Sequence, residues 1–314
     1  MAKNKMKITL FKDKTQNGIW QFSSYLAPIE SSFCLSLDEG NTPEVHFDEQ
    51  VILKREDQNP TGSLKDRGMA YLISRAYQDG LKNVVLSSSG NAAISAANYC
   101  NLAKINLFTF VSLTIKEEKL RKITEKGARV FQTLKPVSEA IKFAHQNHYL
   151  NLRPSQNVFG SEGYQTIAFE LAASQGRIED LFLPVSSGVA LVGIAKGFEK
   201  LGFMPRLHVC QPAAVCPIAS AFDKDYFSER KNLADSLVAR HVPLKKEIID
   251  LVKESQGTGW VIESKRIILS QKNLQDRGIE TSNEGALALA AVFKAGEKGV
   301  ILGKTVCLLT GKRY

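Results

Sequence analysis

The sequence predicts an α/β protein with a mainly parallel sheet and helices on both faces. Strand-like runs alternate with helical runs for most of the 314 residues, as parallel strands joined by crossover helices require. The chain is 44% hydrophobic, enough to bury the core of one large domain or two smaller ones. We find no internal repeat and no low-complexity tract.

The expected elements follow the two hydrophobic periods in chain order. Short apolar and β-branched runs predict strands at 51–53, 83–87, 105–111, 129–132, 181–185, 206–210 and 305–309. Longer runs predict helices at 65–79, 91–101, 116–127, 136–147, 163–174, 189–200 and 284–294. The section 222–260 is the least regular and most charged, and we expect it to form an excursion at the surface.

Lys65 follows a strand, a turn and a helix start. The strand at 51–53 is followed by turn residues at 59–62, and Ser63 is a suitable N-cap for the next helix. Lys65 is therefore expected in the first helical turn, where the helix dipole disfavours its charge. A neutral lysine amine is what imine formation with an aldehyde needs. The same segment fits an ordinary solvated lysine equally well.

Small residues follow two further predicted strands, at positions where a helix begins. Residues 87–93 read Ser-Ser-Ser-Gly-Asn-Ala-Ala, and residues 186–190 read Ser-Ser-Gly-Val-Ala. Such junctions present backbone N–H groups to an anion, although most are only tight strand-to-helix connections. A third strand, at 305–309, is followed by Thr310, which by itself reads as a strand-end threonine bonded to backbone.

Composition restricts the remaining classes. The five cysteines are far apart and read as free thiols in a reducing compartment. His208, Cys210 and Cys216 could ligate a metal, but buried strand and turn residues are the better interpretation, and we expect no metal. The net charge of +9 is spread over several helices, which favours a solvated basic surface over nucleic-acid binding. No apolar run reaches membrane-spanning length, and the N-terminus is too charged for a signal peptide, so we expect a cytoplasmic protein.

Taken in order, these segments resemble the pyridoxal-phosphate enzymes of the tryptophan-synthase β family, also called fold type II. Residues 36–43, Ser-Leu-Asp-Glu-Gly-Asn-Thr-Pro, are similar to that family's N-terminal motif. Residues 205–212, Ala234–Leu237 and Glu284–Leu287 also have counterparts there. Within the family, the chain is most similar to the threonine synthases. The resemblance implies two α/β domains, a smaller mobile one of residues 58–151 and a larger cofactor-binding one of residues 1–57 with 152–314.

The resemblance also implies roles for individual residues around pyridoxal 5'-phosphate in a cleft between the domains. Lys65 would carry the cofactor covalently and act as the general base, and Asn91 would bind the phenolic oxygen of the ring. Thr310 would face the pyridine nitrogen. The cofactor phosphate would be held by Ser186, Ser187, Gly188, Val189 and Ala190, and the substrate by Ser88, Ser89, Gly90 and Arg153.

The implied activity is that of a lyase in threonine biosynthesis, producing threonine from O-phosphohomoserine, with a small amino-acid substrate and a homodimeric state. Three residues depart from the threonine synthase pattern: Gly160 replaces an arginine that binds the substrate phosphate, Gln165 a lysine, and Ala92 a threonine. Arg153 is close in sequence to the missing arginine. A threonine or serine dehydratase and a β-replacing synthase of the cysteine-synthase type therefore stay open. A non-catalytic pyridoxal-phosphate-binding homologue is a third possibility.

Overall fold

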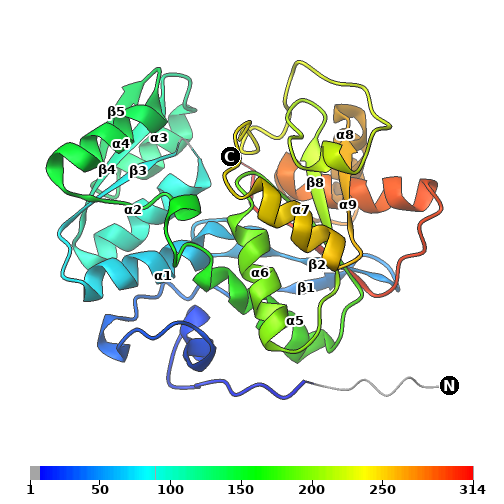
Figure 1. Ribbon diagram of the computed structural model, residues 1–314, viewed down its shortest axis with the longest axis horizontal. Coiled ribbons are helices and arrows are strands. Elements are labelled where there is room, and N and C mark those ends of the chain that lie inside the picture. The colour runs from blue at the N-terminus through cyan, green and yellow to red at the C-terminus, as the bar shows by residue number, and fades with distance from the viewer. Residues whose placement is uncertain (1–7, 89, 314) are drawn as a thin grey trace. The chain divides into compact units, whose positions relative to one another are not determined.

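The computed structural model describes residues 8–88 and 90–313 (Figure 1). These residues form two compact units. The larger unit contains residues 8–10, 41–58 and 164–313, and the smaller unit contains residues 11–40 and 59–163. Each unit is built around a sheet of its own.

The larger unit contains a six-stranded sheet in the order β1-β2-β10-β7-β8-β9. β1 pairs antiparallel with β2, and every other pair is parallel. The strands are β1 (Glu44–His46), β2 (Val51–Lys54), β7 (Asp180–Pro184), β8 (Arg206–Pro212), β9 (Thr258–Ile262) and β10 (Thr305–Leu308). β7, β9 and β10 are almost completely buried, as strands covered on both faces must be.

Helices cover both faces of this sheet. They are α5 (Gln165–Gln175), α6 (Val189–Lys200), α7 (Lys245–Glu254), α8 (Ser264–Gln275) and α9 (Asn283–Glu297). Leu53, Phe182 and Cys210 point to one face and form a core with the apolar side of α9. α5, α6 and α7 lie over the other face (Figure 1). α5 and α6 pack closely against each other, because Gly197 leaves room for the backbone of α5.

The smaller unit contains a four-stranded parallel sheet in the order β5-β4-β3-β6. Its strands are β3 (Asn83–Ser87), β4 (Asn106–Ser112), β5 (Arg129–Thr133) and β6 (Leu150–Asn151), and its helices are α1 (Lys65–Gln78), α2 (Asn91–Ala103), α3 (Glu117–Thr124) and α4 (Pro136–Asn147). Val85, Phe108 and Phe110 pack against α4 on one face. α2 packs against β4 and lies beside α1 and α3.

Short 3₁₀ helices complete the chain at Gly18–Tyr25, Ser31–Phe33, Glu56–Gln58, Pro154–Gln156, Glu162–Tyr164 and Ala219–Ala221. Among the helices of the described residues, none is both long and apolar enough to span a membrane.

The α/β class and its mainly parallel sheets are confirmed, and the strand predicted at 83–87 matches β3. The section predicted as an irregular surface excursion, 222–260, contains regular structure in its second half. α7, which is largely exposed, and most of β9 fall there, and Trp260 of β9 is buried. β9 is held by parallel pairing with β8, which no local pattern reveals. β1 and β6 were also missed, because strands of three and two residues carry almost no periodic signal.

Candidate functional site

Lys65 is the first residue of α1, as the sequence predicts. The turn before it is closed by the carboxylate of Asp66, which accepts hydrogen bonds from the N–H (2.7 Å) and the hydroxyl of Thr61. The Ser63 hydroxyl accepts a weak bond of 3.3 Å from the Lys65 N–H. Asp66 therefore ties the turn to the first helical residues and fixes where Lys65 begins the helix.

The Lys65 side chain is half-buried, and burial lowers the pKa of its amine to about 8. Surrounding protein replaces part of the water that would stabilise the ammonium form. The structure thus supplies the desolvation that a nucleophilic lysine needs, in addition to its place at a helix start. At pH 7 about a tenth of this amine is unprotonated, far more than of an ordinary lysine.

The turn between β3 and α2 carries the second predicted group in the smaller unit. The Ser88 hydroxyl accepts a 3.3 Å hydrogen bond from the Gly90 N–H, and Gly90 forms the N-cap of α2. A Cβ atom on Gly90 would meet nothing within 4 Å, so the turn borders open space. The prediction for Ser89 lies outside the described residues.

Asn91 is the first residue of α2, and its Oδ1 atom is buried without a hydrogen-bond partner among the described residues. Buried side-chain oxygens are nearly always bonded, so an orphaned amide oxygen indicates a group that binds there. The two ends of an amide exchange on rotation, and the side chain offers both a donor and an acceptor. Asn91 therefore fits a polar ligand beside α2.

Arg153 precedes the 3₁₀ helix Pro154–Gln156. Its N–H donates to Asn151 Oδ1, and its guanidinium makes no hydrogen bond or ion pair within the described part of the chain. Gly160 lies directly against this segment, since a Cβ atom there would be 2.0 Å from the Pro154 carbonyl oxygen. No side chain fits at position 160 without moving the backbone. Arg153 is therefore close to Gly160, the position where the resemblance predicts an arginine.

In the larger unit, residues 186–190 connect β7 to the N-terminus of α6. Gly188 is the N-cap of α6 with φ +84°, a conformation that L side chains rarely adopt. A Cβ atom on Gly188 would lie 1.9 Å from Cδ1 of Ile248, which α7 packs against the loop. The loop is thus shaped for a residue without a side chain.

This junction has the chemistry of an anion site. The first N–H groups of α6 have no acceptor within the helix, and the positive end of its dipole points the same way. Ser186 and Ser187 are half-buried and add two hydroxyls. Because the contacts come mainly from backbone, Val189 and Ala190 are compatible with phosphate binding. The loop fits the phosphate of a cofactor.

Thr310 is 8% exposed and follows β10. On one side of it, the Leu309 N–H donates to the Lys54 carbonyl. On the other, the Gly311 carbonyl accepts bonds from the Thr281 hydroxyl (3.1 Å) and the Ser282 N–H (2.9 Å). The backbone on both sides of Thr310 is therefore fixed.

The motifs Ala234–Leu237 and Glu284–Leu287 meet in the same unit. Glu284 is buried, and its Oε1 atom accepts a 2.7 Å hydrogen bond from the Ser236 N–H. Asn283 donates a 2.8 Å bond to the Leu233 carbonyl. The start of α9 thus holds the irregular segment before α7, and both motifs have a structural role here.

His208 belongs to a buried network. Its Nε2 atom lies 2.9 Å from Asp180 Oδ1, and Trp260 Nε1 donates to its Nδ1 atom at 3.2 Å. With both ring nitrogens engaged, His208 is a core residue of β8. Burial lowers the pKa of its imidazole, and the hydrogen bond to Asp180 opposes this only in part. The neutral imidazole with its proton on Nε2 satisfies both partners.

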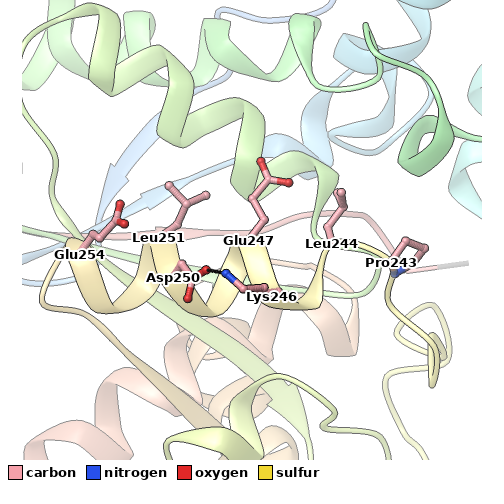
Figure 2. A pocket seen from close by; sticks show the side chains of 7 residues that line it. All are labelled: Pro243, Leu244, Lys246, Glu247, Asp250, Leu251 and Glu254. Atoms are coloured by element: carbon pink, nitrogen blue, oxygen red, sulfur yellow. Dashed lines mark hydrogen bonds and ion pairs between the residues drawn. The ribbon is translucent and has the colours of Figure 1, made fainter.

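A surface groove of about 500 Å³ runs along α7 from Pro243 to Glu254 (Figure 2). Figure 2 shows Glu247, Leu251 and Glu254 along this helix and an ion pair between Lys246 and Asp250, 2.7 Å long. None of the predicted site residues lines this groove.

The described site residues thus fall into two sets. Lys65, Ser88, Gly90, Asn91 and Arg153 belong to the smaller unit, and residues 186–190 with Thr310 belong to the larger one. Sequence reasoning missed Asp66 and Ile248. The Thr-x₄-Asp spacing before Lys65 is a usable signal for Asp66. Nothing in the sequence connects Ile248 to Gly188, which lies sixty positions earlier.

Comparison with known proteins gives a consistent result. Residues 35–311 match the family described as pyridoxal-phosphate dependent enzyme. Threonine synthase of Methanosarcina acetivorans is 28% identical, over 98% of this chain and 82% of its own length. That of Methanocaldococcus jannaschii is 27% identical, over 95% and 80%. The structure of maize serine racemase superposes with a TM-score of 0.76 at 20% identity, covering 88% of this chain and 89% of that one, and so shares the fold.

Proposed function

The chain belongs to the family of pyridoxal-phosphate-dependent enzymes, and from this we propose that it is a threonine synthase, a lyase that converts O-phosphohomoserine and water to threonine and phosphate. The observation that carries the proposal is the similarity to threonine synthases along nearly the whole chain. The lowered pKa of Lys65 and the orphaned oxygen of Asn91 support the cofactor site.

Each end of the cofactor has a suitable group in this chain. The Lys65 amine would bind it covalently, the Asn91 amide would donate to its phenolic oxygen, and the Thr310 hydroxyl would face its pyridine nitrogen. Its phosphate would be held by the backbone N–H groups of residues 186–190. When bound, pyridoxal phosphate supplies a conjugated ring that withdraws electrons from the substrate α-carbon.

Lys65 has a second task in this proposal. With a pKa of about 8, its amine takes a proton from the substrate α-carbon and returns it near neutral pH. Ser88, Ser89 and Gly90 bind the substrate carboxylate through hydroxyl and N–H donors, orienting the α-carbon toward this amine. Thr310 is neutral and does not hold a full proton on the pyridine nitrogen as a carboxylate does. That suits elimination and replacement reactions better than transamination.

We place the distal phosphate of the substrate on Arg153. Its guanidinium is uncommitted within the described residues, and the segment it begins occupies the space beside Gly160. A planar guanidinium binds a phosphate through two parallel hydrogen bonds. The arginine that binds the substrate phosphate would thus lie at position 153, seven positions before Gly160, within the same fold.

The second candidate is a threonine or serine dehydratase, or a β-replacing synthase of the cysteine-synthase type. The absence of a side chain at Gly160 and the neutral Gln165 favour it, because these substrates carry no second phosphate. In that case Arg153 is only a surface cation.

A substrate panel tests the proposal. Purified holoenzyme is assayed with O-phosphohomoserine, threonine, serine and O-acetylserine, and we expect phosphate release from the first to be the fastest reaction. Arg153→Ala should raise its KM about tenfold to a hundredfold, the effect of losing a charge-assisted contact, while cofactor affinity stays the same.

Arg121→Ala is the matched control, because it removes an exposed arginine of the same unit whose ion pair within the described residues is with Glu125. Ammonia release from threonine or serine, with little phosphate release, would support the second candidate. Fast phosphate release that Arg153→Ala does not change would show that another cation binds the substrate phosphate.

A homodimer in the cytoplasm is also part of the proposal, on the resemblance alone. Light scattering of the purified holoenzyme measures its mass directly. A mass of one chain at micromolar concentration would contradict the dimer without affecting the proposed reaction.

A further inference from the structure

A polar stripe runs along one buried face of α2 in the smaller unit. Asn91, Ser95 and Tyr99 are spaced four residues apart, so their side chains are neighbours on one side of the helix. The hydroxyl of Tyr99, a fully buried residue, donates a 2.6 Å hydrogen bond to Glu39 Oε2. The polar group at the Tyr99 end of the stripe therefore has a hydrogen-bond partner.

Glu39 fixes this end firmly. Its carboxylate also accepts hydrogen bonds from the N–H groups of Leu37 (3.0 Å) and Ile19 (3.3 Å) and from the Ser36 hydroxyl (3.1 Å). Tyr99 is thus tied to a carboxylate that the preceding loop surrounds. This contact, together with the packing of α2 against α1 and β4, holds the rotation of α2 about its axis, and with it the side on which Ser95 and Asn91 lie.

The near end of the stripe is different. Ser95 Oγ and Asn91 Oδ1 are both buried, and neither has a hydrogen-bond partner among the described residues. Ser95 is completely inaccessible. Two orphaned oxygens one helical turn apart are unfavourable unless they share a partner or bond to each other. Side chains four residues apart on a helix can bond directly after a change of rotamer, or through one bridging water.

We propose that Ser95 is a positioning residue for the cofactor: its hydroxyl hydrogen-bonds Asn91 Oδ1, directly or through one water, and so turns Asn91 Nδ2 toward the phenolic oxygen of pyridoxal phosphate. This inference rests on the cofactor contact of Asn91 proposed above. Without the Ser95 donor, the amide is free to rotate and place its own oxygen against that phenolic oxygen, where two acceptors repel.

The orientation has a spectroscopic consequence. A hydrogen bond donated to the phenolic oxygen stabilises its ionised form, and the visible absorption band of the bound cofactor reports that form. Ser95→Ala should reduce the intensity of this band in the holoenzyme. It should also weaken cofactor binding by about threefold to tenfold, the value of one lost hydrogen bond.

Ser270→Ala is the control variant. Ser270 lies on α8 of the larger unit and is also buried, with a hydroxyl that has no hydrogen-bond partner among the described residues, but it makes none of the proposed cofactor contacts. This substitution should change neither the spectrum nor the affinity. Circular dichroism and thermal unfolding of both apoproteins measure any general loss of structure.

A double-mutant cycle with Asn91→Ala decides the inference. If Ser95 acts through Asn91, Ser95→Ala should cause no further change in the Asn91→Ala background. A spectrum altered by Asn91→Ala but not by Ser95→Ala would overturn the role of Ser95 and leave the proposed cofactor site standing. If Asn91→Ala changes neither the spectrum nor the affinity, the role of Ser95 and the proposed cofactor contact of Asn91 are both overturned.

Discussion

Gly188→Ala is expected to damage the loop between β7 and α6 through two additive causes. The backbone has φ +84°, where an alanine costs about 1–2 kcal/mol. The new Cβ atom would lie 1.9 Å from Ile248 Cδ1. Ile248 is fully buried, so its side chain turns away only by disturbing other core atoms, at about 1–3 kcal/mol. Together these terms destabilise the larger unit by about 2–5 kcal/mol.

A second substitution separates the two causes. Ile248→Val removes the clashing Cδ1 atom and by itself costs about 0.5–1.5 kcal/mol. In the double variant most of the steric part of the Gly188→Ala cost should disappear, because only Cγ1, at 3.0 Å from the new Cβ atom, is left, while the backbone part stays. The coupling energy between the two positions is therefore expected to be about 1–3 kcal/mol.

Denaturant unfolding of the four apoproteins, with cofactor titration of each, measures these quantities. Gly296→Ala is the control: Gly296 lies in α9 of the same unit, and a Cβ atom there meets nothing within 4 Å. Equal stability of Gly188→Ala and Gly296→Ala would refute the steric argument. Strict additivity of Gly188→Ala and Ile248→Val would refute the role of Ile248.

Four further predictions follow from the same structure. Lys65→Ala should abolish the visible absorption of the holoenzyme. The rate of cofactor attachment to the wild-type apoprotein should rise with pH up to about 8 and then level off. Cofactor found on another lysine, by peptide mapping after borohydride reduction, would contradict this. Ser187→Ala should bind cofactor almost normally, whereas Gly188→Asp should not bind it, because a carboxylate would repel the phosphate. Burial lowers the pKa of His208, so the unfolded chain binds more protons below about pH 6.5 and stability should fall as the pH drops; His208→Gln should lose that slope in pH-dependent denaturation. Gly160→Arg should impair folding or substrate affinity, because its Cβ would lie 2.0 Å from the Pro154 carbonyl oxygen; improved turnover of O-phosphohomoserine would contradict this.

The smaller unit shows what local sequence determines. Turn residues at 59–62 and a good helix sequence after them are sufficient to predict that α1 begins near Lys65. The strand at 83–87 and the small residues after it likewise predict β3 and the start of α2 at Asn91. These features depend on neighbours within a few positions, because turn geometry and helix capping are short-range effects.

Elements stabilised by distant partners escaped prediction. β9 contains Gly259, whose missing side chain allows Ala219 to approach closely, and its pairing partner β8 lies about fifty positions earlier. A glycine in a strand weakens the local signal, while the tertiary contact supplies the stability. The section 222–260 therefore looked irregular in the sequence although it contains α7 and most of β9.

The chemistry of individual residues also depended on the tertiary structure. The sequence identifies Lys65 as a candidate and the family motif that contains it, but the pKa of about 8 comes from burial. The resemblance predicts an arginine at position 160, but only the fold brings the Pro154 carbonyl against Gly160. Desolvation and close packing arise between residues that are far apart along the chain or enclosed from several sides. Sequence therefore determined which groups the candidate site contains, and tertiary structure decided the pKa of Lys65 and the space around Gly160.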